Sequence, residues 1–272
     1  MTPEPQELEI FAAVERAAKQ VAEACHEVGR DPGEVEIELA VKTRSAQECF
    51  VAGKALNAVG RPALLAHNRV QEAQAMESEM ALWAGAGQAS LEGFQMSLIG
   101  PLQRNKINHA LRCFQQVESV DSLRLATALD KRVQRGWEDS SQRAGAADTP
   151  SEANSSQRRP LPVFLQVNTS AEPTKSGVEP GEALQVATQI SQLQGLELVG
   201  FMTIGANTTD GEVVKQSFLR LRNIRDQAVK IPELTSARQL SMGMSGDFPL
   251  AIACGATRIR LGSVIFGARP RP

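Results

Sequence analysis

Residues 35–48, VEIELAVKTRSAQE, contain one complete strand-to-helix unit. Hydrophobic side chains occupy every second position from Val35 to Val41, which is the period of a β-strand with one face against a core. Ser45 and Glu48 then have capping-box spacing, because the serine hydroxyl and the glutamate carboxylate can each satisfy a free backbone N–H at the start of a helix. The stretch therefore predicts a strand followed directly by a helix.

The same unit recurs along the chain. Further strand patterns, each followed by a helical pattern or a short helical turn, occur at about residues 63–66, 96–99, 116–120, 162–167, 196–203, 239–242 and 258–261. Eight such units in 272 residues match a (β/α)8 TIM barrel, which typically has about 250 residues. An open doubly wound sheet alternates in the same way, but its G-x-G-x-x-G motif is missing after the first strand. With the helix expected over 6–28, the predicted fold is an α/β TIM barrel with an extra N-terminal helix.

Composition excludes several classes of protein. The chain has a net charge of −2 and no apolar run of the roughly 18–20 residues that cross a bilayer. Neither nucleic-acid binding nor membrane attachment is therefore expected. Four widely spaced cysteines and three histidines give no metal or redox motif. The acidic N-terminus does not resemble a secretory signal, so we expect a cytoplasmic protein.

One segment does not fit the alternation. Residues 136–160, GWEDSSQRAGAADTPSEANSSQRRP, are rich in Ser, Ala, Gly and charge and show no hydrophobic period. This composition predicts a disordered surface insertion between a helix and the fifth strand. We interpret it as an insertion and not as a boundary, so residues 1–272 are expected to form a single domain.

The ends of the predicted strands are where chemistry is expected, because a TIM barrel carries its active site at the carboxyl ends of its strands. Lys42 directly follows the first strand. Its amine could react with a carbonyl group to form a Schiff base. The alternative is a lysine whose stem packs along the barrel rim with its head in water.

Two small-residue turns follow the last two strands. The segment Leu240–Asp247 and the turn at Gly262 and Ser263 offer backbone N–H and hydroxyl donors to an anion. In barrels, loops after strands seven and eight commonly bind phosphate, so a phosphomonoester site is one interpretation. Ordinary tight turns are the other.

The ordered set of motifs resembles the pyridoxal phosphate homeostasis protein family, also known as YggS-like proteins or proline synthetase co-transcribed homologues, whose barrel is similar to the N-terminal domain of alanine racemase. The motifs are 39–43 (LAVKT), 67–72 (HNRVQE), 98–106 (LIGPLQRNK), 166–170 (QVNTS), 175–177 (KSG), 200–205 (GFMTIG), 240–247 (LSMGMSGD) and 258–263 (RIRLGS). The resemblance covers about residues 8–267, apart from the insertions. The segment 240–247 is the most specific part of it.

The resemblance implies that the cofactor is pyridoxal 5′-phosphate (PLP), bound to Lys42 as a Schiff base. It also implies a role for each remaining motif residue. Asn68 would lie near the ring, Met202 would pack against the cofactor, Arg260 would face the pyridine nitrogen, Ser245, Gly262 and Ser263 would hold the phosphate, and Ser241 and Met242 would shape the phosphate loop. Val41, His67 and Ser97 depart from the usual family pattern.

Two functions follow from this cofactor. In the first, the protein binds PLP reversibly, with little or no turnover, and takes part in vitamin B6 and amino-acid homeostasis. An arginine stays protonated, so Arg260 would leave the pyridine nitrogen unprotonated and the ring a poor electron sink. In the second, the chain is an amino-acid racemase-like enzyme of low activity with a second base such as His67. The chain has no tyrosine, the residue that serves as one of the two bases in alanine racemase.

The expected partners follow from the first function. They are PLP and PLP-dependent apoenzymes that receive it, and the chain is expected to be a monomer. Lys175 lies on a Gly- and Ser-rich loop, where a solvated charge is the simplest interpretation.

Overall fold

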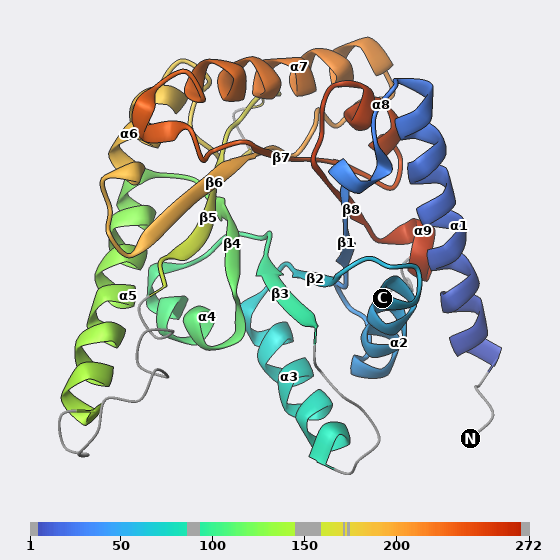
Figure 1. The fold of residues 1–272 in the computed structure, drawn as a ribbon, viewed down its shortest axis with the longest axis horizontal. Helices are drawn as coiled ribbons and strands as arrows, with labels where there is room; N and C mark the ends of the chain where they lie inside the picture. Colours follow the sequence, from blue (N-terminus) through green and yellow to red (C-terminus); the bar gives the residue numbers. More distant parts are fainter. Residues whose placement is uncertain (1–4, 86–92, 145–158, 171, 173–174, 268–272) are drawn as a thin grey trace.

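The structure is a computed structural model that describes residues 5–85, 93–144, 159–170, 172 and 175–267. Eight parallel strands close into a barrel in chain order, with β1 paired to both β2 and β8 (Figure 1). The predicted TIM-barrel fold is therefore confirmed. The strands are β1 Glu36–Ala40, β2 Ala63–His67, β3 Phe94–Leu98, β4 Gln116–Val120, β5 Leu161–Gln166, β6 Leu196–Met202, β7 Gln239–Met244 and β8 Arg258–Leu261.

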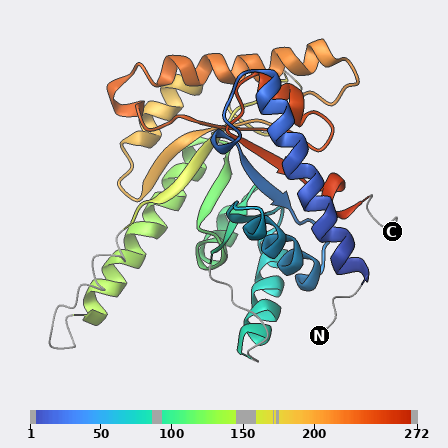
Figure 2. The same ribbon diagram turned by 45° about the vertical axis from the view of Figure 1, so that its right-hand side comes forward.

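Helices surround the barrel. They are α1 Pro5–Glu27, α2 Ala46–Ala58, α3 Val70–Gly85, α4 Ile107–Cys113, α5 Leu123–Ala144, α6 Ala183–Ser191, α7 Gly211–Ala228, α8 Phe248–Ala253 and α9 Ser263–Phe266, with short 3-10 turns at Pro32–Glu34, Arg104–Lys106 and Pro232–Leu234. The extra helix α1 packs on the outside against α2, α8 and α9, as Figures 1 and 2 show from two directions. Among the described helices, none combines the length and the apolar composition needed to cross a bilayer.

Local signals in the sequence account for where some elements begin. The capping box at α2 forms as predicted: Ser45 Oγ accepts from the Glu48 N–H at 3.2 Å, and Glu48 Oε2 accepts from the Ser45 N–H at 2.8 Å. Helix α5 differs from the prediction. It continues to Ala144, so residues 136–144 belong to a helix and not to a disordered insertion. Residues 145–158 of the predicted insertion lie outside the described residues.

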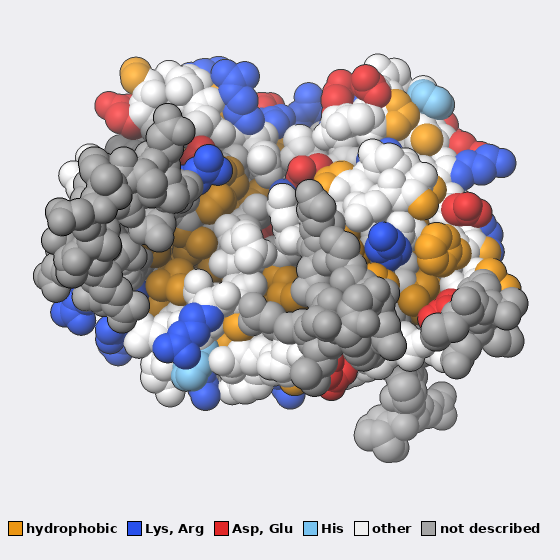
Figure 3. Space-filling model, turned by 60° about the horizontal axis from the view of Figure 1, so that its bottom comes forward, with side chains coloured by type: hydrophobic (Ala, Val, Ile, Leu, Met, Phe, Trp, Pro, Cys, Tyr) orange, Lys and Arg blue, Asp and Glu red, His pale blue; other side chains and the backbone are white. Residues whose placement is uncertain are grey.

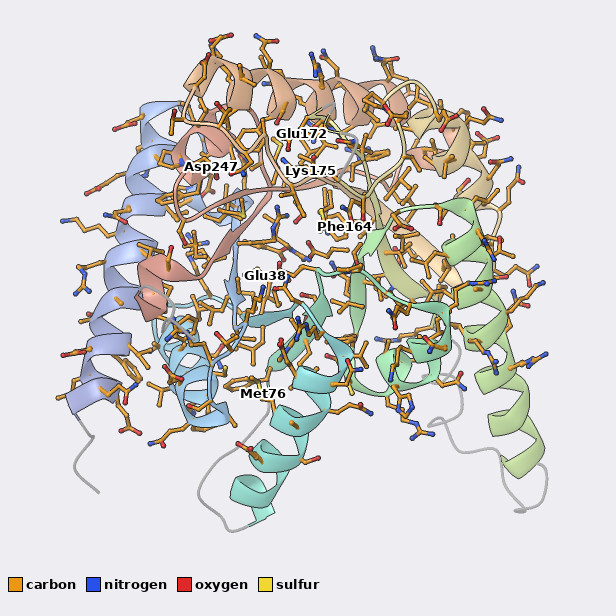
Figure 4. All side chains as sticks on the ribbon, turned by 180° about the vertical axis from the view of Figure 1, so that it is seen from behind. Glu38, Met76, Phe164, Glu172, Lys175 and Asp247 are labelled. Carbon is orange, nitrogen blue, oxygen red and sulfur yellow. The ribbon has the colours of Figure 1, made fainter. Side chains whose placement is uncertain are left out.

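Each strand has one side toward the helices and one toward the barrel axis. In β1, Ile37 and Leu39 join the large apolar cluster between strands and helices, whereas Glu38 lies inside the barrel (Figure 4). In β8, Arg258 and Arg260 take the inner positions in the same way. The apolar alternation of the strands therefore packs against helices, and charged side chains occupy part of the interior that branched apolar residues usually fill.

Candidate functional site

A cavity of about 300 Å³ lies at the carboxyl ends of the strands. Its lining comes from the ends of β1, β2, β3, β6, β7 and β8 and from α9. Among the lining residues are seven of the nine predicted site residues, namely Lys42, Asn68, Met202, Ser245, Arg260, Gly262 and Ser263. The volume is at the lower end of the roughly 300–1,000 Å³ typical of small-molecule sites. A small ligand would therefore be closely surrounded.

Lys42 is half-buried and lies just after β1. Together with Asn68 it also borders a second cavity, of about 710 Å³, that extends along the start of α3. Thr43, the next residue, has a φ of +62° and is the only described non-glycine residue in the left-handed region. That conformation is unfavourable for a β-branched residue, and such strain is found most often at functional sites. No feature of the sequence predicted it.

Asn68 is positioned by a close approach of two backbones. The loop after β3 passes so near to it that a Cβ at Gly100 would collide with the carbonyl oxygen of Asn68. Only glycine permits that approach. Helix α3 begins at Val70, so Asn68 lies before the helix, and it borders both cavities.

Hydrogen-bond donors gather where β7 and β8 end. Ser245 Oγ accepts from the N–H groups of Gly262 and Val264, at 3.0 and 3.4 Å. Ser263 lines the same end of the cavity, and at Gly246 a Cβ would meet no atom within 4 Å. Backbone N–H groups and hydroxyls in such a turn suit a phosphate group. This corner therefore has the donor set of a phosphomonoester site.

Arg260 forms the inner wall of the cavity and is almost completely buried. Its Nη1 donates to Ser241 Oγ at 2.6 Å, and its Nη2 donates to the carbonyl oxygen of Thr203 at 2.7 Å. Burial lowers the pKa of Arg260, against the opposing effect of the Glu118 carboxylate.

Ser241 and Met242, the other two predicted site residues, do not line this cavity. Successive strand residues point to opposite faces, so these neighbours cannot both face a ligand. Ser241 lies in the barrel interior, where its hydroxyl is 2.5 Å from Glu118 Oε2. Met242 is buried in the apolar cluster between strands and helices. Neither position brings a side chain to the cavity.

His67 and Lys175 also lie outside the lining. The His67 ring is buried near Phe114, with ring centroids 5.9 Å apart, and burial lowers its pKa to about 4. It is therefore neutral at pH 7 and does not face the cavity as a second base. Lys175 is not a solvated loop charge: its Nζ donates to Glu172 Oε1 and to the Gly205 carbonyl, both at 2.7 Å (Figure 4).

The barrel interior contains a polar network that the sequence patterns did not predict. Glu118 on β4 accepts from Ser241 through Oε2 and forms an ion pair with Arg258 through Oε1. A second buried carboxyl group, on Glu38, accepts from Ser97. Burial and the neighbouring Glu118 charge raise the pKa of Glu38 to about 8. At pH 7 Glu38 therefore holds a proton.

This network also borders a hollow at the opposite, amino end of the barrel. The hollow has a volume of about 770 Å³ and includes Glu38, Ser97 and Arg258 in its lining. Apolar residues such as Leu64, Met96 and Val133 form much of its wall, and Figure 3 shows hydrophobic side chains gathered in a hollow on that face. Its lining among the described residues includes no lysine that could react with a carbonyl group, so the smaller cavity, which Lys42 lines, is the candidate site.

Comparison with known proteins places the chain in a family. The model of the alanine racemase N-terminal domain matches residues 50–270. The pyridoxal phosphate homeostasis protein of Pseudomonas aeruginosa is 32% identical over 94% of both chains. The chain belongs to the pyridoxal phosphate homeostasis protein family.

Other members of this family match over part of their length. The Helicobacter pylori pyridoxal phosphate homeostasis protein is 40% identical over 62% of this chain and 65% of its own. The chain thus spans slightly less than two thirds of that relative.

Solved structures agree with this placement. An unknown protein from Bifidobacterium adolescentis has a TM-score of 0.80 at 34% identity, covering 98% of each chain. PipY of Synechococcus elongatus, solved with PLP bound, has a TM-score of 0.66 at 28% identity, covering 91% of this chain and all of its own. Alanine racemases, such as that of Corynebacterium glutamicum at 14% identity and a TM-score of 0.58, share the fold.

Proposed function

We propose that this protein binds PLP reversibly and takes part in vitamin B6 and amino-acid homeostasis. The observation that carries the proposal is the convergence of a lysine amine, a buried guanidinium and a small-residue donor turn on one cavity of about 300 Å³. PLP presents an aldehyde, a pyridine nitrogen and a phosphate, which these three groups match. The PLP-bound structure of the family member PipY supports the same cofactor.

Each lining residue then has a role. Lys42 supplies the amine that bonds to the aldehyde carbon, with release of one water molecule. Ser245, Ser263 and the N–H of Gly262 hold the phosphate. Asn68 and Met202 flank the ring, and Arg260 faces the pyridine nitrogen. Ser241 and Met242 act only indirectly, since neither lines the cavity.

The nature of Arg260 favours holding the cofactor over turning over a substrate. A guanidinium donates hydrogen bonds and keeps its proton, so a pyridine nitrogen facing it stays unprotonated. An unprotonated ring withdraws electrons poorly, which disfavours racemisation. His67, the alternative second base, lies outside the cavity lining and is neutral at pH 7.

Reversible PLP binding also implies where the protein acts and which partners it has. A PLP carrier would act in the cytoplasm as a monomer and pass its cofactor to PLP-dependent apoenzymes. It would contact neither nucleic acid nor membrane, in keeping with a net charge of −2.

The experiment traps the lysine adduct. Purified protein is incubated with PLP and reduced with borohydride, and its peptides are analysed by mass spectrometry. We expect the pyridoxyl mass on Lys42, and its loss in Lys42→Ala. Lys106→Ala is the matched control, since Lys106 borders the neighbouring cavity and is not among the lining residues of the candidate site. Labelling elsewhere with Lys42 unmodified would refute the proposal.

The same preparation separates a carrier from a racemase. The holoprotein is incubated with L-alanine or D-alanine, and the enantiomers are resolved by chiral chromatography. We expect no conversion faster than that given by free PLP at the same concentration. Faster conversion that requires Lys42 would favour the racemase.

A further inference from the structure

Arg260 is held by a chain of hydrogen bonds whose direction is fixed. A guanidinium can only donate, so Ser241 Oγ accepts from Arg260 Nη1. The serine hydrogen is then directed to Glu118 Oε2, 2.5 Å away. A single hydroxyl group, that of Ser241, thus links the Glu118 carboxylate to the Arg260 guanidinium. These contacts use two of the five N–H donors of the guanidinium, so others remain that a ligand in the cavity could accept from.

Glu118 is itself firmly held. The residue is completely buried, and its Oε1 accepts from Arg258 and from Gln116 Nε2. Arg258 in turn pairs with Glu36 at 2.6 Å and lies over the Phe164 ring, 5.1 Å from its centroid. Both oxygens of Glu118 are therefore committed, which leaves its carboxylate little freedom to move.

A second buried carboxyl group offers an internal comparison. Glu38 accepts from Ser97 just as Glu118 accepts from Ser241, also within the barrel. Neither Ser97 nor Glu38 forms a hydrogen bond with Arg260, whose bonded partners among the described residues are Ser241 and Thr203. Both pairs join a buried serine hydroxyl to a completely buried glutamate, but only the Ser241–Glu118 pair contacts Arg260.

We propose that Glu118, acting through Ser241, is a positioning residue that fixes the Arg260 guanidinium in the cofactor cavity. This inference rests on the proposed function. Glu118 and Ser241 do not touch the cofactor. They align Arg260 so that one of its uncommitted N–H groups meets the pyridine nitrogen, and they thereby set the affinity of the protein for an unprotonated pyridine ring.

The test compares PLP with an analogue in which C–H replaces the ring nitrogen while the aldehyde and phosphate remain. We expect Ser241→Ala to raise the dissociation constant of PLP roughly tenfold, the effect of losing one hydrogen bond to a charged group. The analogue cannot accept from Arg260, so its dissociation constant should change much less. The preference for PLP over the analogue should therefore fall.

Ser97→Ala is the matched control, with thermal unfolding measured on both variants. It removes an equivalent hydroxyl and should leave the preference for PLP unchanged. Glu118→Gln should act in the same direction as Ser241→Ala, and the double variant should lose little more than the larger single effect, because the two residues form one relay. Ser241→Ala keeps the Glu118–Arg258 ion pair, so it remains informative if Glu118→Gln fails to fold.

The outcomes distinguish this inference from the proposed function. If wild-type protein gives no Lys42 adduct, the proposed function fails. If the adduct forms but Ser241→Ala keeps the full preference for PLP, or Ser97→Ala loses it equally, only the positioning role is overturned.

Discussion

Ser245 directly follows β7 and Gly262 directly follows β8, and the Ser245 hydroxyl accepts a hydrogen bond from the Gly262 N–H at 3.0 Å. The same N–H group is a donor that a phosphate would use. The Ser245 hydroxyl accepts this bond through its oxygen while its own hydrogen can be donated to an anion, so it would organise the turn without a ligand and contribute to binding with one.

Ser245→Ala should therefore weaken PLP binding. Loss of a hydroxyl donor to a phosphate, and of the contact that aligns the turn, should raise the dissociation constant roughly tenfold to a hundredfold. Equilibrium dialysis with PLP measures it. Ser191→Ala is a suitable control, because Ser191 ends α6, away from the cavity lining, and its hydroxyl donates to the Thr188 carbonyl. Equal affinity of wild type and Ser245→Ala would contradict the proposed phosphate site.

Thr43, which follows Lys42 of the candidate site, predicts a gain in stability on substitution. Its φ of +62° is unfavourable for a β-branched side chain, whereas asparagine adopts this region more readily. Thr43→Asn should raise the free energy of unfolding by about 1 kcal/mol, measured by urea denaturation. Thr127→Asn, in the second turn of α5, should not be stabilising. A loss of stability in Thr43→Asn would contradict this prediction and would mean that the Thr43 side chain has a contact that outweighs the backbone strain.

The barrel and most of the site could be predicted because both depend on short-range patterns. A hydrophobic period of two followed by a capping box indicates a strand and then a helix. Parallel strands bring their carboxyl ends together, so Lys42, Asn68 and Arg260 meet although they are far apart in sequence. The seven cavity residues follow from that rule and from the family resemblance.

The interior network could not be predicted from the same patterns. Glu36 and Glu38 alternate with apolar residues, and such alternation is the same whether the polar face meets water or the inside of a barrel. Strand β7 shows a related limit. Motif resemblance treats Ser241 and Met242 alike, but the alternation of side chains sends them to opposite faces. Gly136 and the serines that follow it predicted that the helix ends there, but α5 continues to Ala144.

His67 predicts loss of stability in acid. Burial lowers its pKa from 6.5 to about 4, so the unfolded chain binds a proton in this range that the folded protein does not. The free energy of unfolding should therefore fall as the pH drops from about 6.5 toward 4. The free energy of unfolding of His67→Gln should fall less over that range, and urea midpoints at pH 7 and pH 5 measure it. His26→Gln, on the exposed end of α1, is the control. An unchanged pH dependence in His67→Gln would contradict the neutral buried ring.

Glu38 predicts a change of opposite sign. Its pKa is raised from 4.5 to about 8, so between these values the folded protein holds a proton that the unfolded chain has released. This contribution lowers the free energy of unfolding as the pH rises from about 4.5 to 8. Glu38→Gln should remove it, and the stability of the variant relative to wild type should increase from pH 5 to pH 8.

Glu197→Gln is a suitable control, because Glu197 also borders the hollow at the amino end of the barrel but is exposed. Urea denaturation at pH 5, 6.5 and 8 measures all three proteins. Below pH 6.5 the Glu38 and His67 effects oppose each other in the wild type. Relative to wild type, the free energies of unfolding of Glu38→Gln and His67→Gln should therefore change with pH in opposite directions. A flat slope for Glu38→Gln, or one of the same sign as that of His67→Gln, would mean that the Glu38 pKa is not raised and that the group is ionised inside the barrel at pH 7.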